Sequence, residues 1–164
     1  MNKDNSTEML IEALLQSNNW YIISPFHCIY GAESDFSELE DYLIKNYIHT
    51  FSDKVSMIVL KMICLYPAYI ELTEFYPEYP PAPLHLVEYT NIRDIGLENI
   101  AKMIEYIVIQ GGTSMNIYFA DFNSLIQISS GFDLVVYSSN QEFLKNLQTL
   151  VNMEGLYMDF RSEL

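Results

Sequence analysis

Apolar residues recur at helical spacing in four segments of the chain. In each segment they return every three or four residues, which is the period of a helix with one buried face. The segments run from Asn5 or Ser6 to Gln16, from Asp35 to Tyr47, from Leu97 to Gln110 and from Asn140 to Met153. The pattern therefore predicts amphipathic helices at these places.

Capping residues predict where these helices begin and end. Asp35 with Glu38, and Ser139 with Glu142, have the spacing of a capping box. Gly111 follows the third helix, and glycine often ends a helix in a left-handed conformation. The first helix is expected to bury a face formed by Met9, Leu10, Ala13 and Leu14. The second is expected to bury a stripe formed by Phe36, Leu39, Leu43 and Tyr47.

Strands are predicted where aromatic and β-branched residues cluster between turn formers. Three such runs, Met115–Phe122, Leu125–Ser129 and Phe132–Ser138, are separated by short turns and predict an antiparallel meander. Further strands are predicted at Trp20–Ser24, Ala68–Tyr76, Leu84–Thr90 and Leu156–Phe160. Val55–Tyr66 is an uninterrupted apolar run whose period fits a buried helix or a buried strand, and its length favours a helix.

The order of these elements indicates the fold class. Helices come first, a hairpin sheet follows, and a further helix packs after it, which is typical of α+β proteins rather than of a doubly wound parallel sheet. A length of 164 residues is ordinary for one domain, and 50% hydrophobic residues are enough to build a core. We expect a single α+β domain over residues 1–164, with an antiparallel sheet packed against four or five helices.

The charge balance restricts the class of partner. The chain has 22 acidic and 8 basic residues, which gives a formal net charge of −14 spread over both halves. Binding to a phosphate backbone depends mainly on Lys and Arg, so nucleic acid is not expected as a partner, whereas a basic protein is. The alternative is that the charge serves only solubility.

Other sequence signals concern location. The first apolar stretch is interrupted by Glu12, so no export signal is expected, and no apolar run has the roughly 20 residues that span a bilayer. Cys28 and Cys64 are far apart and are interpreted as buried thiols in a reducing compartment. These features predict a cytoplasmic protein that does not bind membranes.

The chain contains no recognisable catalytic motif. It lacks a nucleophile elbow, a phosphate-binding loop and a dinucleotide fingerprint. The histidines are His27, His49 and His85, and none of them belongs to a zinc-binding spacing, although His27 adjoins Cys28. We therefore expect a protein that is not an enzyme and that uses no metal or cofactor, while a cysteine nucleophile with a distant histidine stays an alternative.

Two groups of residues are candidates for binding a partner. One is the acidic side of the second helix, with Glu38, Glu40 and Asp41. The other is a proline-rich segment with Glu74, Tyr76, Glu78 and Tyr79. Tyrosine is frequent at the energetic centres of interfaces, and acidic neighbours speed the encounter with a basic protein. The alternative is that the acids form an ordinary solvated face and that the rings pack back onto the core.

The C-terminal part of the chain resembles the immunity proteins of bacterial toxin systems, such as those of contact-dependent inhibition. The resemblance lies in the runs Met115–Phe122 and Asp133–Tyr137, the helix from Gln141 and the closing Glu154–Tyr157, together with size and acidity. It implies an inhibitor that covers the active site of a cognate toxin domain, often a basic nuclease. The alternatives are a phage-type DNA mimic and a regulatory or scaffold subunit.

Overall fold

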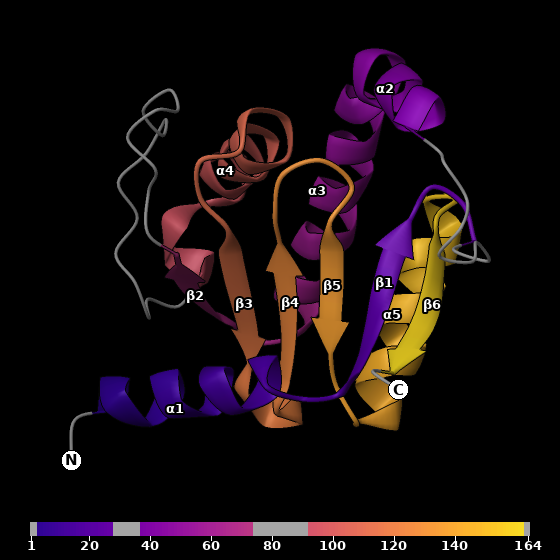
Figure 1. The fold of residues 1–164 in the computed structure, drawn as a ribbon. Helices are drawn as coiled ribbons and strands as arrows, with labels where there is room; N and C mark the ends of the chain where they lie inside the picture. The colour runs from indigo at the N-terminus through magenta and orange to yellow at the C-terminus, as the bar shows by residue number, and fades with distance from the viewer. Residues whose placement is uncertain (1–2, 28–36, 74–91, 163–164) are drawn as a thin grey trace.

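A computed structural model describes residues 3–27, 37–73 and 92–162 and arranges them as one sheet with helices on both faces (Figure 1). The helices are α1 (Lys3–Leu15), α2 (Ser37–Asn46), α3 (Ile48–Leu65), α4 (Leu97–Gln110) and α5 (Gln141–Met153). The strands are β1 (Asn19–Ser24), β2 (Tyr69–Leu72), β3 (Met115–Phe119), β4 (Ser124–Ile128), β5 (Leu134–Tyr137) and β6 (Tyr157–Ser162). Short 3-10 turns occupy η1 (Ile92–Ile95) and η2 (Ala120–Phe122).

The six strands form a single antiparallel sheet in the order β2-β3-β4-β5-β1-β6. The meander predicted from the sequence is confirmed as β3, β4 and β5. The predicted strand Leu156–Phe160 corresponds to β6, and it pairs with β1 rather than with the meander. The protein is therefore a mixed α+β single domain, as predicted.

The larger core lies between the sheet and the helices α3, α4 and α5. Ile126 and Ile128 of β4 point into it, and so does Val136 of β5. Gln127, between the two isoleucines, points to the opposite face because side chains alternate along a strand. In Figure 1 these three helices lie behind the sheet.

A smaller core lies on the opposite face, where α1 crosses the lower end of the sheet (Figure 1). Ile11 of α1 packs with Tyr118 and Leu125, and Leu14 and Leu15 pack around them. Residues 11, 14 and 15 follow the spacing of one narrow helix stripe. Only that stripe is covered, so α1 hides little of its own surface.

Two predictions for α1 were wrong. The helix begins at Lys3, before the proposed caps Asn5 and Ser6. Its buried residue is Ile11, whereas Met9 is 69% exposed, and Leu10 and Ala13 are exposed as well. The physical reason is that apolar residues occur on several sides of this helix, so the sequence did not say which side would meet the sheet.

Two helix ends differ from the prediction: a different residue caps α5, and the backbone angle ψ of Gly111 after α4 is not the expected one. Asn140, not Ser139, caps α5, because its Oδ1 accepts a hydrogen bond from the Phe143 amide at 3.0 Å. Gly111 has the expected positive φ of 74°, but its ψ of −147° is not left-handed helical. Asp35 and Phe36 lie outside the described residues.

The other ambiguous segments are resolved in part. The run predicted at Val55–Tyr66 is helical up to Leu65, as its length favoured, and belongs to α3, after which Tyr66 is extended. The predicted strand Met115–Phe122 ends at Phe119 and continues as η2, which turns into β4 through Asn123 with a φ of 44°. Of Ala68–Tyr76 only β2 is a strand among the described residues, and Leu84–Thr90 lies outside them.

The prediction of a buried thiol at Cys64 was wrong, because this side chain is exposed. Met62 and Ile63 are buried on the inner side of the last turn of α3, and Cys64 follows on the outer side. Arg93 donates hydrogen bonds to the carbonyl oxygens of Ile63 and Cys64 and so satisfies this helix end. Cys28 lies outside the described residues.

The described helices do not include one that is both long and apolar enough to span a membrane.

Candidate protein-binding surface

Helix α2 projects from the body of the molecule, beyond the upper ends of the strands in Figure 1. Its main packing partner is α3, which follows after Tyr47. None of its residues is buried. The helix therefore presents most of its circumference to solvent.

The acidic residues predicted for this helix are exposed, and two of them share a face. Glu38 and Asp41 are three residues apart, and Tyr42 lies one turn from Glu38, so these side chains lie on the same side of the helix. Glu40 lies on a different side, together with Ile44. The structure thus brings together Glu38 and Asp41 but not Glu40.

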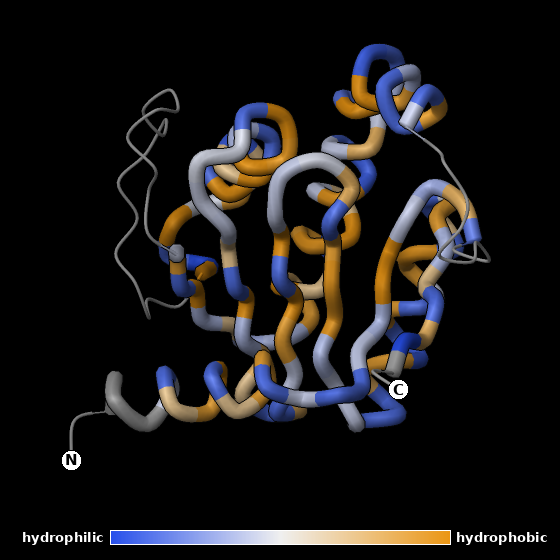
Figure 2. Tube along the Cα trace, viewed as in Figure 1, coloured by the Kyte–Doolittle hydropathy of each residue, from blue (hydrophilic) through white to orange (hydrophobic). Residues whose placement is uncertain are grey.

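Apolar side chains are exposed on the same helix. Tyr42 is 62% exposed, and Leu39 and Ile44 are exposed large hydrophobic residues as well. Figure 2 shows hydrophilic and hydrophobic positions close together around the turns of α2. The face formed by Glu38, Asp41 and Tyr42, with Leu39 beside it, is called the α2 surface below.

Sequence reasoning missed Tyr42 and placed Leu39 in the buried stripe. Leu43 and Tyr47 of that stripe are half-buried, as expected, whereas Leu39 is exposed. The helical spacing of Tyr42 from Glu38 could have shown that the two residues share a side of the helix. The exposure of Leu39 could not be predicted from the sequence, because it depends on how little of α2 the rest of the protein covers.

No ion pair neutralises the α2 surface within the described ranges. Their ion pairs are His27–Asp159, Lys61–Glu154 and Lys102–Glu98, and none of them involves α2. The nearby Lys54 lies over the Tyr47 ring, with its Nζ 5.7 Å from the ring centroid. The basic residue of α2 itself, Lys45, lies one turn after Asp41 on the same side of the helix and reduces the negative potential there, although it forms none of these ion pairs.

The charges of α2 also affect the helix itself. Glu38 and Glu40 are in its first turn and Lys45 is in its last turn, an arrangement that stabilises a helix through its dipole. This effect accounts for the two glutamates without any partner. Asp41 has the helix-stabilising i, i+4 spacing to Lys45, so only the exposed Tyr42 is left without an explanation in the stability of the helix.

The second predicted group cannot be placed. Glu74, Tyr76, Glu78 and Tyr79 lie outside the described residues.

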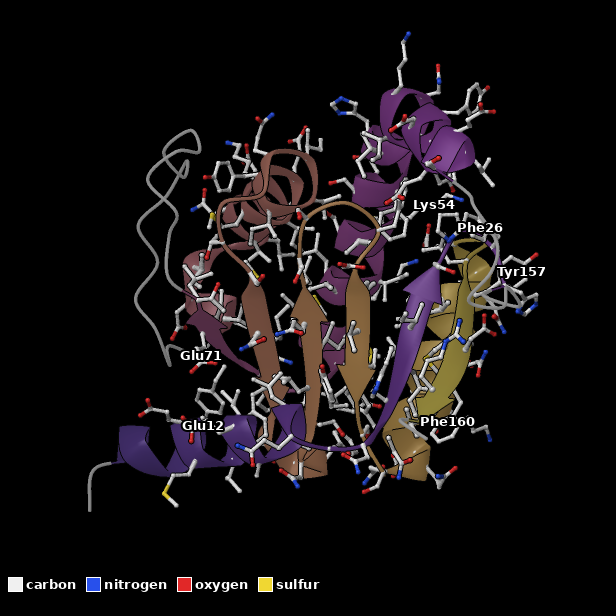
Figure 3. The ribbon with its side chains drawn as sticks, viewed as in Figure 1. Glu12, Phe26, Lys54, Glu71, Tyr157 and Phe160 are labelled. Atoms are coloured by element: carbon white, nitrogen blue, oxygen red, sulfur yellow. The ribbon has the colours of Figure 1, made fainter. Side chains whose placement is uncertain are left out.

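Polar residues form a row across three strands on the sheet face that carries α1. Asn116 donates a hydrogen bond from Nδ2 to Glu71 Oε2 at 2.8 Å, and Gln127 donates from Nε2 to Asn116 Oδ1 at 3.1 Å. Asn116 is only 1% exposed, so these bonds satisfy a buried amide. Glu71, labelled in Figure 3, is thus tied to β3 through a buried amide.

His27 contacts an acidic residue at the opposite edge of the sheet. Its Nδ1 lies 3.0 Å from Asp159 Oδ1, and its ring centroid lies 3.9 Å from that of Tyr157. In the part of the chain that the structure describes, no hydroxyl or thiol is hydrogen-bonded to this imidazole, and no three metal-binding side chains cluster. His49 is exposed on α3, and His85 lies outside the described residues.

Within the described part of the chain, the pKa values of Glu98 and Tyr118 are displaced, and neither residue lies on α2. The hydrogen bond from Lys102 lowers the pKa of Glu98, and burial raises the pKa of Tyr118. The first shift arises from a contact within α4, and the second arises from the packing of Tyr118 in the smaller core. They give no indication of a reactive centre.

Comparisons with known proteins found no matching family model, no matching curated protein and no matching solved structure.

Proposed function

We propose that the protein is an immunity protein, which binds a cognate basic toxin domain through the α2 surface and covers its active site. The observation that carries this proposal is the exposed Tyr42 beside Glu38 and Asp41 on a helix without buried residues. A tyrosine flanked by carboxylates suits a protein partner with basic and apolar groups.

The weak packing of α2 supports a role in binding. A helix of 10 residues is marginal in water unless packing stabilises it. This helix leaves Leu39, Tyr42 and Ile44 exposed, so a partner that covers them would remove apolar surface from water and stabilise the helix.

The net charge of the chain supports a basic protein as the partner. A net charge of −14 attracts a basic protein over a distance of several ångströms before contact, which raises the association rate. Nuclease domains carry basic clefts because they bind phosphate groups, so an acidic helix can both approach and cover such a cleft.

The apolar part of the α2 surface favours an immunity protein over a DNA mimic. A mimic needs carboxylates in regular rows, as phosphates are in DNA. On α2 the carboxylates alternate with Leu39, Tyr42 and Ile44, which are exposed apolar side chains that phosphate mimicry does not use.

The test uses two double variants with equal charge change. In one, Glu38→Lys and Asp41→Lys reverse the α2 surface. In the other, Glu8→Lys and Glu12→Lys reverse two exposed acids of α1. The wild type and the α1 variant are expected to capture a basic protein from a lysate of the source cell and to neutralise the toxin domain encoded by the adjacent gene. The α2 variant is expected to lose both properties.

A third variant separates binding from helix stability, because Glu38 also stabilises the first turn of α2. Tyr42→Ala leaves the charge unchanged and is expected to weaken binding at least tenfold, as removal of an interface tyrosine commonly does, by about 2 kcal/mol. Equal binding by all variants would exclude α2 from the interface. Capture of a restriction enzyme would instead support the DNA mimic.

A further inference from the structure

Strand β6 is a regular edge of the sheet. β1 is its neighbour on one side, and its register with β1 is unbroken from Tyr157 to Ser162, so the strand contains no bulge. It contains no proline and no lysine, which commonly protect an edge, and its charged residues are Asp159 and Arg161. Phe160, labelled on this strand in Figure 3, is 55% exposed.

We propose that two copies of the chain pair through β6, antiparallel and about a two-fold axis at Phe160, so that their sheets become continuous. Strand pairing through an edge supplies backbone hydrogen bonds to both partners. A two-fold interface uses the same surface in both copies, so the strand must be complementary to itself.

The faces of β6 restrict how two copies can meet. Met158 belongs to the core beneath the helices, and the Phe160 ring lies 5.3 Å from the Tyr21 ring on that same face. Tyr157, Asp159 and Arg161 alternate with them and lie on the other face. A two-fold axis perpendicular to the sheet leaves each face of the second copy on the same side as in the first copy. Asp159 can therefore lie opposite only those residues of the second copy that belong to the same face, namely Tyr157, Asp159 or Arg161.

The charges of β6 select one register among those that remain. With the axis at Phe160, Asp159 lies opposite Arg161 of the second copy, and this pair occurs twice. An axis at Asp159 would place two carboxylates opposite each other, and an axis at Arg161 would place two guanidinium groups opposite each other. Opposite charges across a strand pair stabilise it and like charges destabilise it.

The other edge of the sheet, β2, cannot bring opposite charges together in this way. β2 contains a single charged residue, Glu71, and no base. No symmetric pairing of β2 with itself therefore joins opposite charges. This difference favours β6 as the edge at which two copies pair.

The proposal is independent of the function proposed for α2. Figure 3 places Phe160 near the lower end of the sheet, whereas α2 lies beyond its upper end. Pairing through β6 would leave the α2 surface of each copy open. A monomeric protein could still be an inhibitor, and a dimer could still bind another partner.

The first experiment measures mass by sedimentation equilibrium of the full chain over a range of concentrations. The mass is expected to rise from 19.1 kDa toward twice that value. Asp159→Arg alone and Arg161→Asp alone place like charges opposite each other, so each should weaken dimerisation at least tenfold. The double variant restores opposite charges and should restore the dimer.

The double variant also controls for the contact between His27 and Asp159, because that contact is lost in it and in Asp159→Arg alike. Thermal unfolding of all variants checks that they are folded. A mass of one chain at every concentration, or a double variant no better than the single ones, would overturn the proposal.

The second experiment locates the axis in a background with Cys28→Ser and Cys64→Ser. Phe160→Cys places two thiols on the axis and is expected to form a disulfide-linked dimer on mild oxidation. Tyr157→Cys places them about 20 Å apart at roughly 3.3 Å per residue and is not expected to do so. Equal crosslinking at both positions, or none at residue 160, would contradict the register.

Discussion

At the scale of single residues, the main core buries the Ser52 hydroxyl, which no group of the described residues satisfies. The Ser52 hydroxyl on α3 is buried, and among the described residues it has no hydrogen-bond partner. A buried hydroxyl without a partner lowers stability, because it loses its hydrogen bonds to water.

Replacing this residue with alanine is expected to stabilise the fold. Ser52→Ala removes the unsatisfied hydroxyl and raises the helix propensity of the position, so the free energy of unfolding should increase by about 0.5–1.5 kcal/mol. Urea unfolding followed by circular dichroism measures the change. A matched change at Ser56, Ser56→Ala, tests the specificity, because its hydroxyl is not among the unsatisfied atoms. A loss of stability in Ser52→Ala would show that the hydroxyl has a partner.

Sequence reasoning was least successful at this scale. Cys64 lies in the most apolar run of the chain and was expected to be buried, yet the outer side of α3 is exposed where it ends. Met9 and Ile11 are both apolar and two residues apart, and only the narrow contact of α1 with the sheet decides which of them is buried. Burial of an individual side chain depends on the neighbouring element, which local pattern does not specify.

At the scale of elements, Asn140 fixes the beginning of α5. Its side chain accepts a hydrogen bond from the Phe143 amide, and Leu144 donates its amide hydrogen to the Asn140 carbonyl at 3.0 Å. The helix then buries Phe143, Leu144, Leu147 and Val151. The cap therefore positions a helix that covers the larger core.

Removal of this cap is expected to destabilise the protein. Asn140→Ala should lower the free energy of unfolding by about 0.5–2 kcal/mol, because one amide at the helix start loses its acceptor. Ser139→Ala is the control and should change little, since the Ser139 side chain is exposed and does not cap the helix. Chemical denaturation of both variants measures the difference. The reverse order of effects would show that Ser139 is the cap.

Most elements could be predicted, and the reasons are physical. The periods of α4 and α5, and the clusters of aromatic and β-branched residues between turn formers in β3, β4 and β5, are local properties of the chain, so these elements were found with errors of a few residues. The position of β1 between β5 and β6 could not be found, because strand order depends on contacts between distant segments. The exposed α2 acids were predicted, whereas the exposure of Tyr42 depends on how little of α2 is covered.

At the scale of the whole molecule, the net charge of −14 acts against the compact state. Between described residues, an acidic and a basic side chain meet in the contacts His27–Asp159, Lys61–Glu154 and Lys102–Glu98, whereas the chain has 22 acidic and 8 basic residues. Mutual repulsion of like charges is larger in the folded state, where they are closer together.

Salt is therefore expected to stabilise the fold. Between about 0.02 M and 0.5 M sodium chloride the screening length falls from roughly 20 Å to about 4 Å, and the midpoint of thermal unfolding should rise by several degrees. The variant Glu8→Lys with Glu12→Lys carries less negative charge and should respond less. Differential scanning calorimetry measures both. A midpoint that falls with salt would show that favourable ion pairs outweigh the repulsion.

The place of β1 in the sheet has a consequence during synthesis. This strand is translated well before both of its neighbours, β5 and β6. Until residue 162 has emerged, Ile23 has only an incomplete sheet beside it, and closing such a long stretch of chain is entropically costly. The nascent chain therefore exposes apolar strand surface for most of its translation, which is the condition under which chaperones bind.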